Sequence, residues 1–99
     1  MAKTKTTPFE IADHLRSPKE MAGYLDAMIE ESGGDAAAIA HALGDIARAQ
    51  GMSKVARAAG LSRESLYKAL SGDRSPDFQT ILKVVKALGL KLTAEAAGR

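Results

Sequence analysis

Two short amphipathic segments on either side of Gly60 constrain the fold of this chain more than any other feature of its sequence. We expect a first helix over residues 54–59, capped by Ser53. A second helix over residues 63–70 is capped by Ser62, because serine is a favoured N-cap residue. Gly60 interrupts the apolar pattern, and glycine adopts the positive φ that a tight turn between steeply crossed helices needs. The sequence therefore predicts two short helices that pack against each other.

Seven positions in about 15 residues carry the residue types that a helix-turn-helix requires. Small or apolar side chains fall where the helices touch each other and the core, glycine falls at the turn, and an apolar residue follows it. These positions are Val55, Ala56, Ala59, Gly60, Leu61, Leu66 and Ala69. Two capped helices joined by a glycine also occur in helical bundles, so a protein-binding module without DNA function stays open as an alternative.

The second short segment has outward-facing side chains suited to base edges in the major groove of DNA. Arg and Lys match the acceptors of guanine, Glu accepts from cytosine N4, and a Tyr ring contacts the thymine methyl group. The predicted base-contacting residues are Arg63, Glu64, Tyr67 and Lys68. Contacts to phosphate add affinity and salt dependence rather than specificity. The residues predicted to make them are Ser53, Lys54, Arg57, Ser62, Ser71 and Arg74.

The charge of the chain is distributed unevenly. The formal net charge is +2 at pH 7, but residues 1–51 sum to −3 and residues 52–99 sum to +5. Residues 52–75, which contain the paired segments, sum to +3. A basic half of this kind indicates a polyanion such as nucleic acid as its partner.

Three further capped helices are predicted outside this pair. Serine followed three residues later by glutamate forms a capping box, and aspartate is a favoured N-cap residue. These caps, Ser17 with Glu20, Asp35 and Asp77, predict helices over residues 18–31, 36–50 and 78–88. The domain organisation that follows is a flexible arm over residues 1–8, an N-terminal helical extension over 9–34, a helix-turn-helix domain over 35–93 and a tail over 94–99.

The end of the chain combines two kinds of apolar pattern. The last predicted helix has a regular stripe at positions i, i+3, i+4 and i+7. Its members are Phe78, Ile81, Leu82, Val85 and Leu88. After Gly89 the residues from Leu90 to Thr93 alternate between apolar and polar, which predicts a short strand. The expected fold class is therefore all-α with a short C-terminal strand.

Composition and motifs exclude several function classes. The chain has no cysteine, which excludes disulfides, cysteine-ligated metals and thiol nucleophiles. Its longest apolar run, residues 36–43, is too short to span a bilayer, and its start lacks the apolar stretch of a signal peptide, so we expect a cytoplasmic protein. His14 and His41 lack a metal-ligand spacing, and no phosphate-binding loop or zinc-protease motif is present. We expect neither an enzyme nor a bound cofactor or metal.

The sequence also resembles a known family over about residues 9–93. The stretch LGDIARAQGMSKVARAAGLSRESLYKAL in residues 43–70 and the run LKVVKALGLKL in residues 82–92 are similar to the probable addiction-module antidote proteins. These resemble HigA-type antitoxins with a Cro/CI-like helix-turn-helix. The resemblance implies a five-helix, lambda-repressor-like domain that binds operator DNA as a homodimer. It also implies a small toxin of the RelE/ParE/HigB type, which the antitoxin neutralises while it represses their shared operon.

Two other surfaces are candidates for partner contacts. The first long helix carries acidic residues that either meet a basic toxin or are simply solvated. They are Glu20, Asp26, Glu30 and Glu31. Apolar residues near the C-terminus either join two copies of the chain or complete the core of one copy. They are Phe78, Val85, Leu90 and Leu92. A stand-alone repressor without a toxin is the remaining alternative to an antitoxin.

Overall fold

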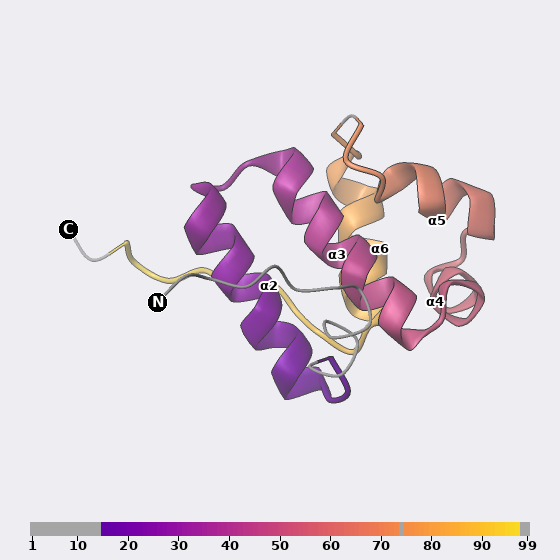
Figure 1. The fold of residues 1–99 in the computed structure, drawn as a ribbon, viewed down its shortest axis with the longest axis horizontal. Coiled ribbons are helices and arrows are strands. Elements are labelled where there is room, and N and C mark those ends of the chain that lie inside the picture. Colours follow the sequence, from indigo (N-terminus) through magenta and orange to yellow (C-terminus); the bar gives the residue numbers. More distant parts are fainter. Residues whose placement is uncertain (1–14, 74, 98–99) are drawn as a thin grey trace, which may run out of the picture.

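The fold consists of α-helices packed around one apolar core (Figure 1). The structure, a computed structural model, describes residues 15–73 and 75–97. These residues form five helices and no strand, which confirms the all-α prediction. The helices are α2 (Pro18–Ser32), α3 (Ala36–Gln50), α4 (Met52–Ala59), α5 (Arg63–Ala69) and α6 (Phe78–Ala87). The predicted arm over residues 1–8 lies outside the described part of the chain. Within that part, no helix has the length and apolar character needed to cross a membrane.

Three of the predicted caps start helices where the sequence placed them. Ser17 Oγ accepts the backbone N–H of Glu20 at 3.2 Å, and the Glu20 carboxylate accepts the N–H of Ser17 at 3.1 Å. Asp35 and Asp77 each accept the N–H of the residue three positions later, at 2.9 and 2.7 Å. Hydrogen bonds from the side chain and the backbone of Thr80 hold the pKa of Asp77 below its usual value. The capping pattern is therefore confirmed at α2, α3 and α6.

The predicted cap at Ser53 is wrong. The helix begins at Met52, two residues before the predicted start, and no side chain caps it. Gly51 alone connects α3 to α4: its N–H donates to the carbonyl of Ala47 at 2.8 Å, and its carbonyl accepts the N–H of Val55 at 3.0 Å. Its φ of 106° lies in the region that favours glycine. Because one residue makes the whole turn, no loop residue remains between the helices for a serine to occupy.

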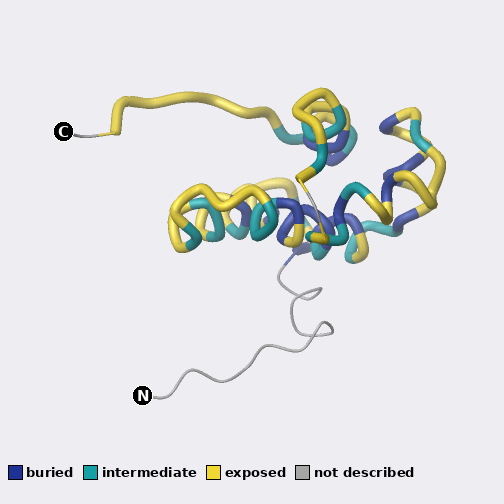
Figure 2. The backbone as a smooth tube through the Cα atoms, turned by 90° about the horizontal axis from the view of Figure 1, so that it is seen from above, coloured by how far each residue is buried: buried dark blue, intermediate teal, exposed yellow. Residues whose placement is uncertain are grey.

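The core forms around α3, which lies beside α2 in Figure 1 with α4 and α5 beyond its other side and α6 behind it. Met21 and Leu25 of α2 belong to the same buried cluster as residues of α3 to α6, so the helix of the predicted extension packs into the common core. Burial follows the inner sides of the helices in Figure 2. The largest fully buried side chains are Leu15, Leu43, Ile46, Leu66, Leu70 and Val84.

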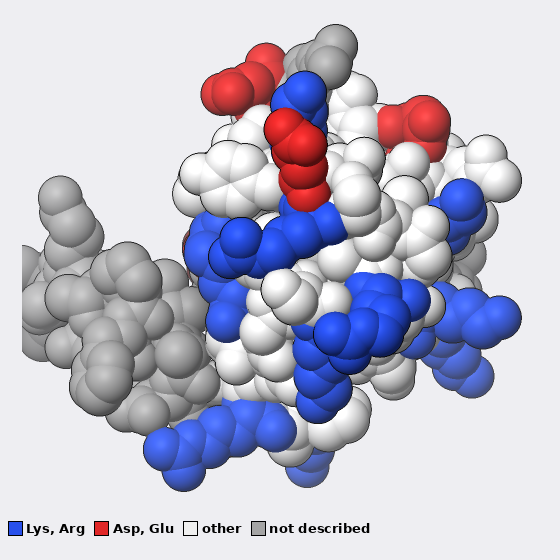
Figure 3. Space-filling view, turned by 90° about the vertical axis from the view of Figure 1, so that its right-hand side faces the viewer, with Lys and Arg blue, Asp and Glu red and all other residues white. Residues whose placement is uncertain are grey.

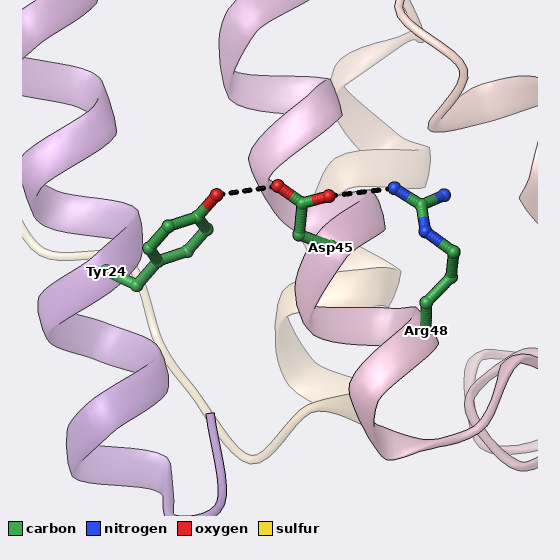
Figure 4. A network of polar contacts seen from close by, with 3 residues as sticks. All are labelled: Tyr24, Asp45 and Arg48. Atoms are coloured by element: carbon green, nitrogen blue, oxygen red, sulfur yellow. Dashed lines mark hydrogen bonds and ion pairs between the residues drawn. The ribbon is translucent and has the colours of Figure 1, made fainter. Parts of the chain in front are cut away.

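A polar bridge also joins α2 to α3 (Figure 4). The Tyr24 hydroxyl donates to Asp45 Oδ2 at 2.6 Å, and the Arg48 guanidinium donates to Asp45 Oδ1 at 2.8 Å. Partial burial, followed by the hydrogen bond and the negative charge of Asp45, raises the pKa of Tyr24 above its usual range. The bridge therefore links α2 to α3 through the hydrogen bond from Tyr24 to Asp45.

The apolar stripe of α6 differs from its prediction. Val84, which the stripe omitted, is fully buried, and the stripe members Val85 and Leu88 are buried in the core of the chain. Phe78 and Leu82 are instead 67% and 43% exposed. The periodicity was right, but the helix is rotated so that one edge of its apolar side faces solvent. The orientation of an amphipathic helix depends on what packs beside it, which periodicity alone does not contain.

The predicted strand over Leu90 to Thr93 is absent: the described residues after α6 have no regular secondary structure. The N–H of Leu90 donates to the carbonyl of Val85 at 3.0 Å, and the N–H of Gly89 donates to that of Lys86 at 3.0 Å, which closes α6 in a Schellman motif. Leu90 then packs partly against the core, while residues 91–97 are exposed (Figure 2). Alternation of apolar residues makes a strand only beside another strand, and the described chain offers none.

Candidate nucleic-acid interface

The turn between α4 and α5 has the geometry that the sequence predicted. Gly60 has a φ of 74°, in the left-handed region. Its N–H donates to the carbonyl of Arg57, and the N–H of Leu61 donates to the carbonyl of Ala56 at 2.9 Å, so α4 ends in a Schellman motif. Ser62 Oγ then accepts the N–H of Ser65 at 2.9 Å and starts α5. The predicted bounds of the second helix are correct to within one residue.

The inner side of this pair is buried as predicted. Leu66 is completely buried. Two other predicted helix-turn-helix positions, Leu61 and Ala69, are partly buried and pack against the core. The buried residues of α4 are Met52, Val55, Ala56 and Ala59. The core therefore fixes the orientation of both helices, and with it the direction in which their outer side chains point.

Two residues that hold this pair were not among the predicted structural positions. Leu70, one turn beyond Leu66, is 2% exposed and belongs to the core. Gly44 in α3 lies against the end of α5, where a Cβ atom would stand only 3.0 Å from the carbonyl oxygen of Leu70. Signals for both exist in the sequence: Leu70 continues the apolar spacing of Leu66, and Gly44 is an isolated glycine inside a helical pattern.

The outer side of α5 presents all four predicted base-contacting residues to solvent. They are Arg63, Glu64, Tyr67 and Lys68. The first three line a shallow hollow, and the Tyr67 side chain is 62% exposed although aromatic residues usually bury much of their surface. Their spacing of one, four and five residues places them on one side of the helix. The structure therefore brings these four residues together as a single exposed surface.

The flanking residues predicted to contact phosphate fall into two groups. Lys54 and Arg57 are exposed on α4, next to the exposed Ser53. Figure 3, which faces the end of the molecule that carries α4 and α5, shows Lys and Arg side chains gathered over this side. Within the described residues, neither these two cations nor Arg63 and Lys68 have an ion-pair partner. Their charges are therefore free to meet an external anion.

The second group is already engaged or outside the described structure. The Ser62 hydroxyl caps α5 and donates to Ser65 Oγ at 2.9 Å. The Ser71 hydroxyl donates to the carbonyl of Lys68 at 3.0 Å and accepts the N–H of Asp73 at 3.2 Å, so it closes the loop after α5. Arg74 lies outside the described residues. Both serines therefore have a structural role that competes with a phosphate contact.

The acidic residues of α2 are all exposed but do not have equivalent surroundings. Glu20 is part of the capping box, and Glu31 is close enough to Tyr24 to add to the rise in its pKa. Asp26 lines a hollow together with the segment that follows α6, and Glu30 lies one turn further along α2. Their assignment to toxin binding stays a prediction.

The apolar residues predicted to join two copies are also divided. Val85 is buried in the core of its own chain, and Leu90 is partly buried there. Phe78 and Leu92 are exposed. Only the last two of these four residues offer surface to a partner without a change in the fold.

Comparison with known proteins identifies one family and one relative. The family described as probable addiction module antidote protein matches residues 5–96 of the chain. An uncharacterised protein from Haemophilus influenzae strain Rd is 49% identical over 87 residues, which cover 88% of each chain. No solved structure has a significant match to this chain.

Proposed function

The chain belongs to the probable addiction module antidote proteins, and on that premise we propose that it is an antitoxin that represses its own operon through α4 and α5. Membership of an antidote family implies a cognate toxin as a partner. The proposal adds the finer assignments: a HigA-like protein with a Cro/CI-type helix-turn-helix, a toxin of the RelE/ParE/HigB type and no catalytic role. It also assigns a palindromic operator that a homodimer binds.

One observation carries the DNA-binding part of this proposal. Leu66 fixes α5 against the core from one side, while Arg63, Tyr67 and Lys68 are exposed together on the other. A rigid helix with unpaired cations and an exposed aromatic ring on one side is the form in which a recognition helix enters the major groove. Lys54 and Arg57 on the preceding helix suit the flanking phosphates, which favours α4 as the helix that crosses the backbone.

The test compares binding to DNA from the chain's own promoter with binding to random DNA in a mobility-shift assay at about 0.1 M salt. The double variant Arg63→Ala/Lys68→Ala should lose the preference for promoter DNA, because each bidentate base contact contributes about 1–3 kcal/mol of discrimination. The matched control Lys19→Ala/Lys83→Ala removes the same charge from α2 and α6 and should retain the preference. An unchanged preference in the first variant would contradict the assignment of α5.

The antitoxin part needs a separate test. A small basic protein encoded next to this chain is the expected toxin, and co-expression of the two should restore the growth that the toxin alone arrests. If promoter binding is specific but no such neighbour exists, the chain is a stand-alone repressor. If the neighbour binds but promoter DNA is bound no better than random DNA, the chain is a protein-binding module.

A further inference from the structure

An apolar groove of about 340 Å³ lies between α2, α3 and α6. Neither α4 nor α5 contributes to its lining, so it is separate from the surface proposed for DNA. Leu25 and Ile29 form its α2 wall, and Ile39 lies on its α3 side. Phe78 and Ile81 bound it on the α6 side.

The groove includes much of the large apolar surface that the described residues leave exposed. Phe78 is 67% exposed and Leu92 is 43% exposed, and both line the groove. Leu82, also 43% exposed, lies one turn after Phe78 on the exposed edge of α6. Contiguous apolar surface of this kind marks an interaction site. The groove is therefore a candidate for a partner that the surface of α5 does not serve.

A small molecule fits this lining poorly. Binding sites for small ligands combine apolar walls with a few converging polar groups that fix orientation. The side chains that line this groove are all apolar, so nothing on its walls would orient a small ligand. A protein surface with an apolar centre and a charged rim is the better match.

The end of the groove where α3 and α6 begin is acidic. Asp35 and Asp77 are the N-caps of these helices, and the residues on both sides of each aspartate line the groove. Figure 1 shows the two helices beginning at the same end of the molecule. Both aspartates are exposed, and neither has an ion-pair partner among the described residues, although the charge of Lys83 reaches Asp77. A carboxylate has about four acceptor sites, so a capping hydrogen bond leaves each of them able to bind a cation.

The acidic residues of α2 lie on two different sides of that helix. At 100° per residue, Asp26 and Glu30 follow Leu25 by about 100° and 140°, whereas Glu20 and Glu31 lie about 140° and 120° away in the opposite direction. Asp26 lines a neighbouring hollow that shares Leu25 with the groove. One lysine and one glutamate of the segment after α6 also line that hollow, and their charges cancel. Acidic charge therefore accompanies the groove along α2 as well as at its end.

We propose that the groove holds an amphipathic segment of the toxin, with apolar side chains against Phe78 and lysine or arginine side chains at Asp35 and Asp77. Amphipathic segments bind apolar grooves through a few anchoring side chains, and bonds from a cation to a carboxylate add orientation. The identity of the partner as a basic toxin rests on the function proposed above. The proposal moves the toxin contact away from Glu20 and Glu31 and leaves the homodimer to a surface outside the groove.

Titration of the full chain with the purified basic protein encoded beside it tests the apolar part of this contact. Phe78→Asp should raise the dissociation constant by about 30-fold or more, as expected for loss of an interface anchor. Its helical circular-dichroism spectrum should be unchanged, because Phe78 is exposed. Tyr67→Asp removes a similarly exposed aromatic ring from α5 and should bind the toxin as the wild type does. A wild-type dissociation constant for Phe78→Asp overturns the proposal.

Removal of charge tests the acidic end. Asp35→Asn/Asp77→Asn keeps both caps, since asparagine is as good an N-cap as aspartate. It should weaken toxin binding by about tenfold at about 0.1 M salt and reduce the dependence of binding on salt. The control Glu20→Gln/Glu31→Gln removes the same charge from the other side of α2, keeps the capping-box pattern and should bind normally. Weakening in the control alone places the toxin on that side of α2 and overturns the proposal.

Other outcomes separate this proposal from the proposed function. A wild-type chain that binds no neighbouring protein refutes the antitoxin role and, with it, the toxin as occupant of the groove. If the wild type binds the toxin and Phe78→Asp binds it equally well, only the groove assignment fails. Sedimentation equilibrium of Phe78→Asp without toxin should give the same mass as the wild type. A monomeric variant of a dimeric wild type assigns the groove to a second copy of the chain and overturns the proposal.

Discussion

The outer surface of α4 and α5 and the groove between α2, α3 and α6 use apolar residues in opposite ways. Beneath the first surface Leu66 is completely buried, and Tyr67 is the one large hydrophobic side chain exposed on the described residues of α4 and α5. At the groove, Phe78 is 67% exposed and lies among apolar side chains. The first surface carries Lys and Arg side chains that have no ion-pair partner among the described residues. The second leaves apolar area in water, which costs roughly 25 cal/mol per Å² until it is covered.

The function proposed above assigns DNA contact to the first of these surfaces in a chain of 99 residues and leaves the second for a protein partner. A surface that meets DNA needs charge and a rigid base, and both come from the core beneath α5. A surface that meets a protein needs an apolar centre, and here it comes from the edge of α6 that the core does not reach. Each of the following experiments tests one side of that contrast.

Truncation of Leu66 and of Phe78 to alanine should give the largest difference in the free energy of unfolding. Leu66→Ala should lower the free energy of unfolding by about 2–5 kcal/mol, because it leaves a cavity in a fully buried site. Phe78→Ala, measured at a concentration where the chain is monomeric, should change it by less than about 0.5 kcal/mol. Urea unfolding followed by circular dichroism measures both. If both variants lose the same free energy of unfolding, Phe78 belongs to the core and the two surfaces do not differ in this respect.

The bridge between α2 and α3 should have an intermediate effect, with a characteristic pH dependence. Tyr24→Phe should lower the free energy of unfolding at pH 7 by about 1–2 kcal/mol, since it removes a hydrogen bond to the Asp45 carboxylate. The raised pKa of Tyr24 means that the folded state keeps its proton where the unfolded state loses it. That contribution is complete below the unfolded pKa of about 10 and decreases as the pH rises above it. Thermal unfolding of both proteins should therefore show a difference that narrows above pH 10.

A wider difference between wild type and Tyr24→Phe at alkaline pH would contradict the direction of this shift. Met21 and Leu25 remain in the core of the variant, so α2 should stay folded.

Loss of one exposed cation on α4 should have the smallest effect on the fold and a uniform effect on DNA binding. Arg57→Gln should leave the midpoint of thermal unfolding unchanged, because the side chain is exposed. It should weaken binding to promoter and random DNA equally and reduce the dependence of log K on log salt by about 1, as expected for one lost phosphate contact. Titrations at several salt concentrations measure the slope. A loss confined to promoter DNA would move Arg57 to the base-contacting group.

The caps and the turn were predictable because they depend on neighbours in sequence. The capping hydrogen bonds of Ser17, Asp35 and Asp77 each join residues three positions apart. The positive φ of Gly60 is set by the tight turn itself, because glycine has no Cβ atom to clash there. The prediction of which α5 residues face the core and which face solvent was also correct, because a short helix packed against a core has one buried side. The prediction failed at Ser53, where Gly51 alone makes the turn, and at residues 90–93, where a strand lacked a neighbour.

The sequence by itself determined the helices, the basic character of the α4–α5 end and the acidic character of α2, because these follow from local propensity and from the order of charges. Only the tertiary structure decided which edge of α6 is buried, that Val85 belongs to the core while Phe78 does not, and that an apolar groove opens between α2, α3 and α6. The physical reason is that burial depends on residues distant in sequence. Periodicity states that a helix has an apolar side, and packing decides how much of that side finds a partner within the same chain.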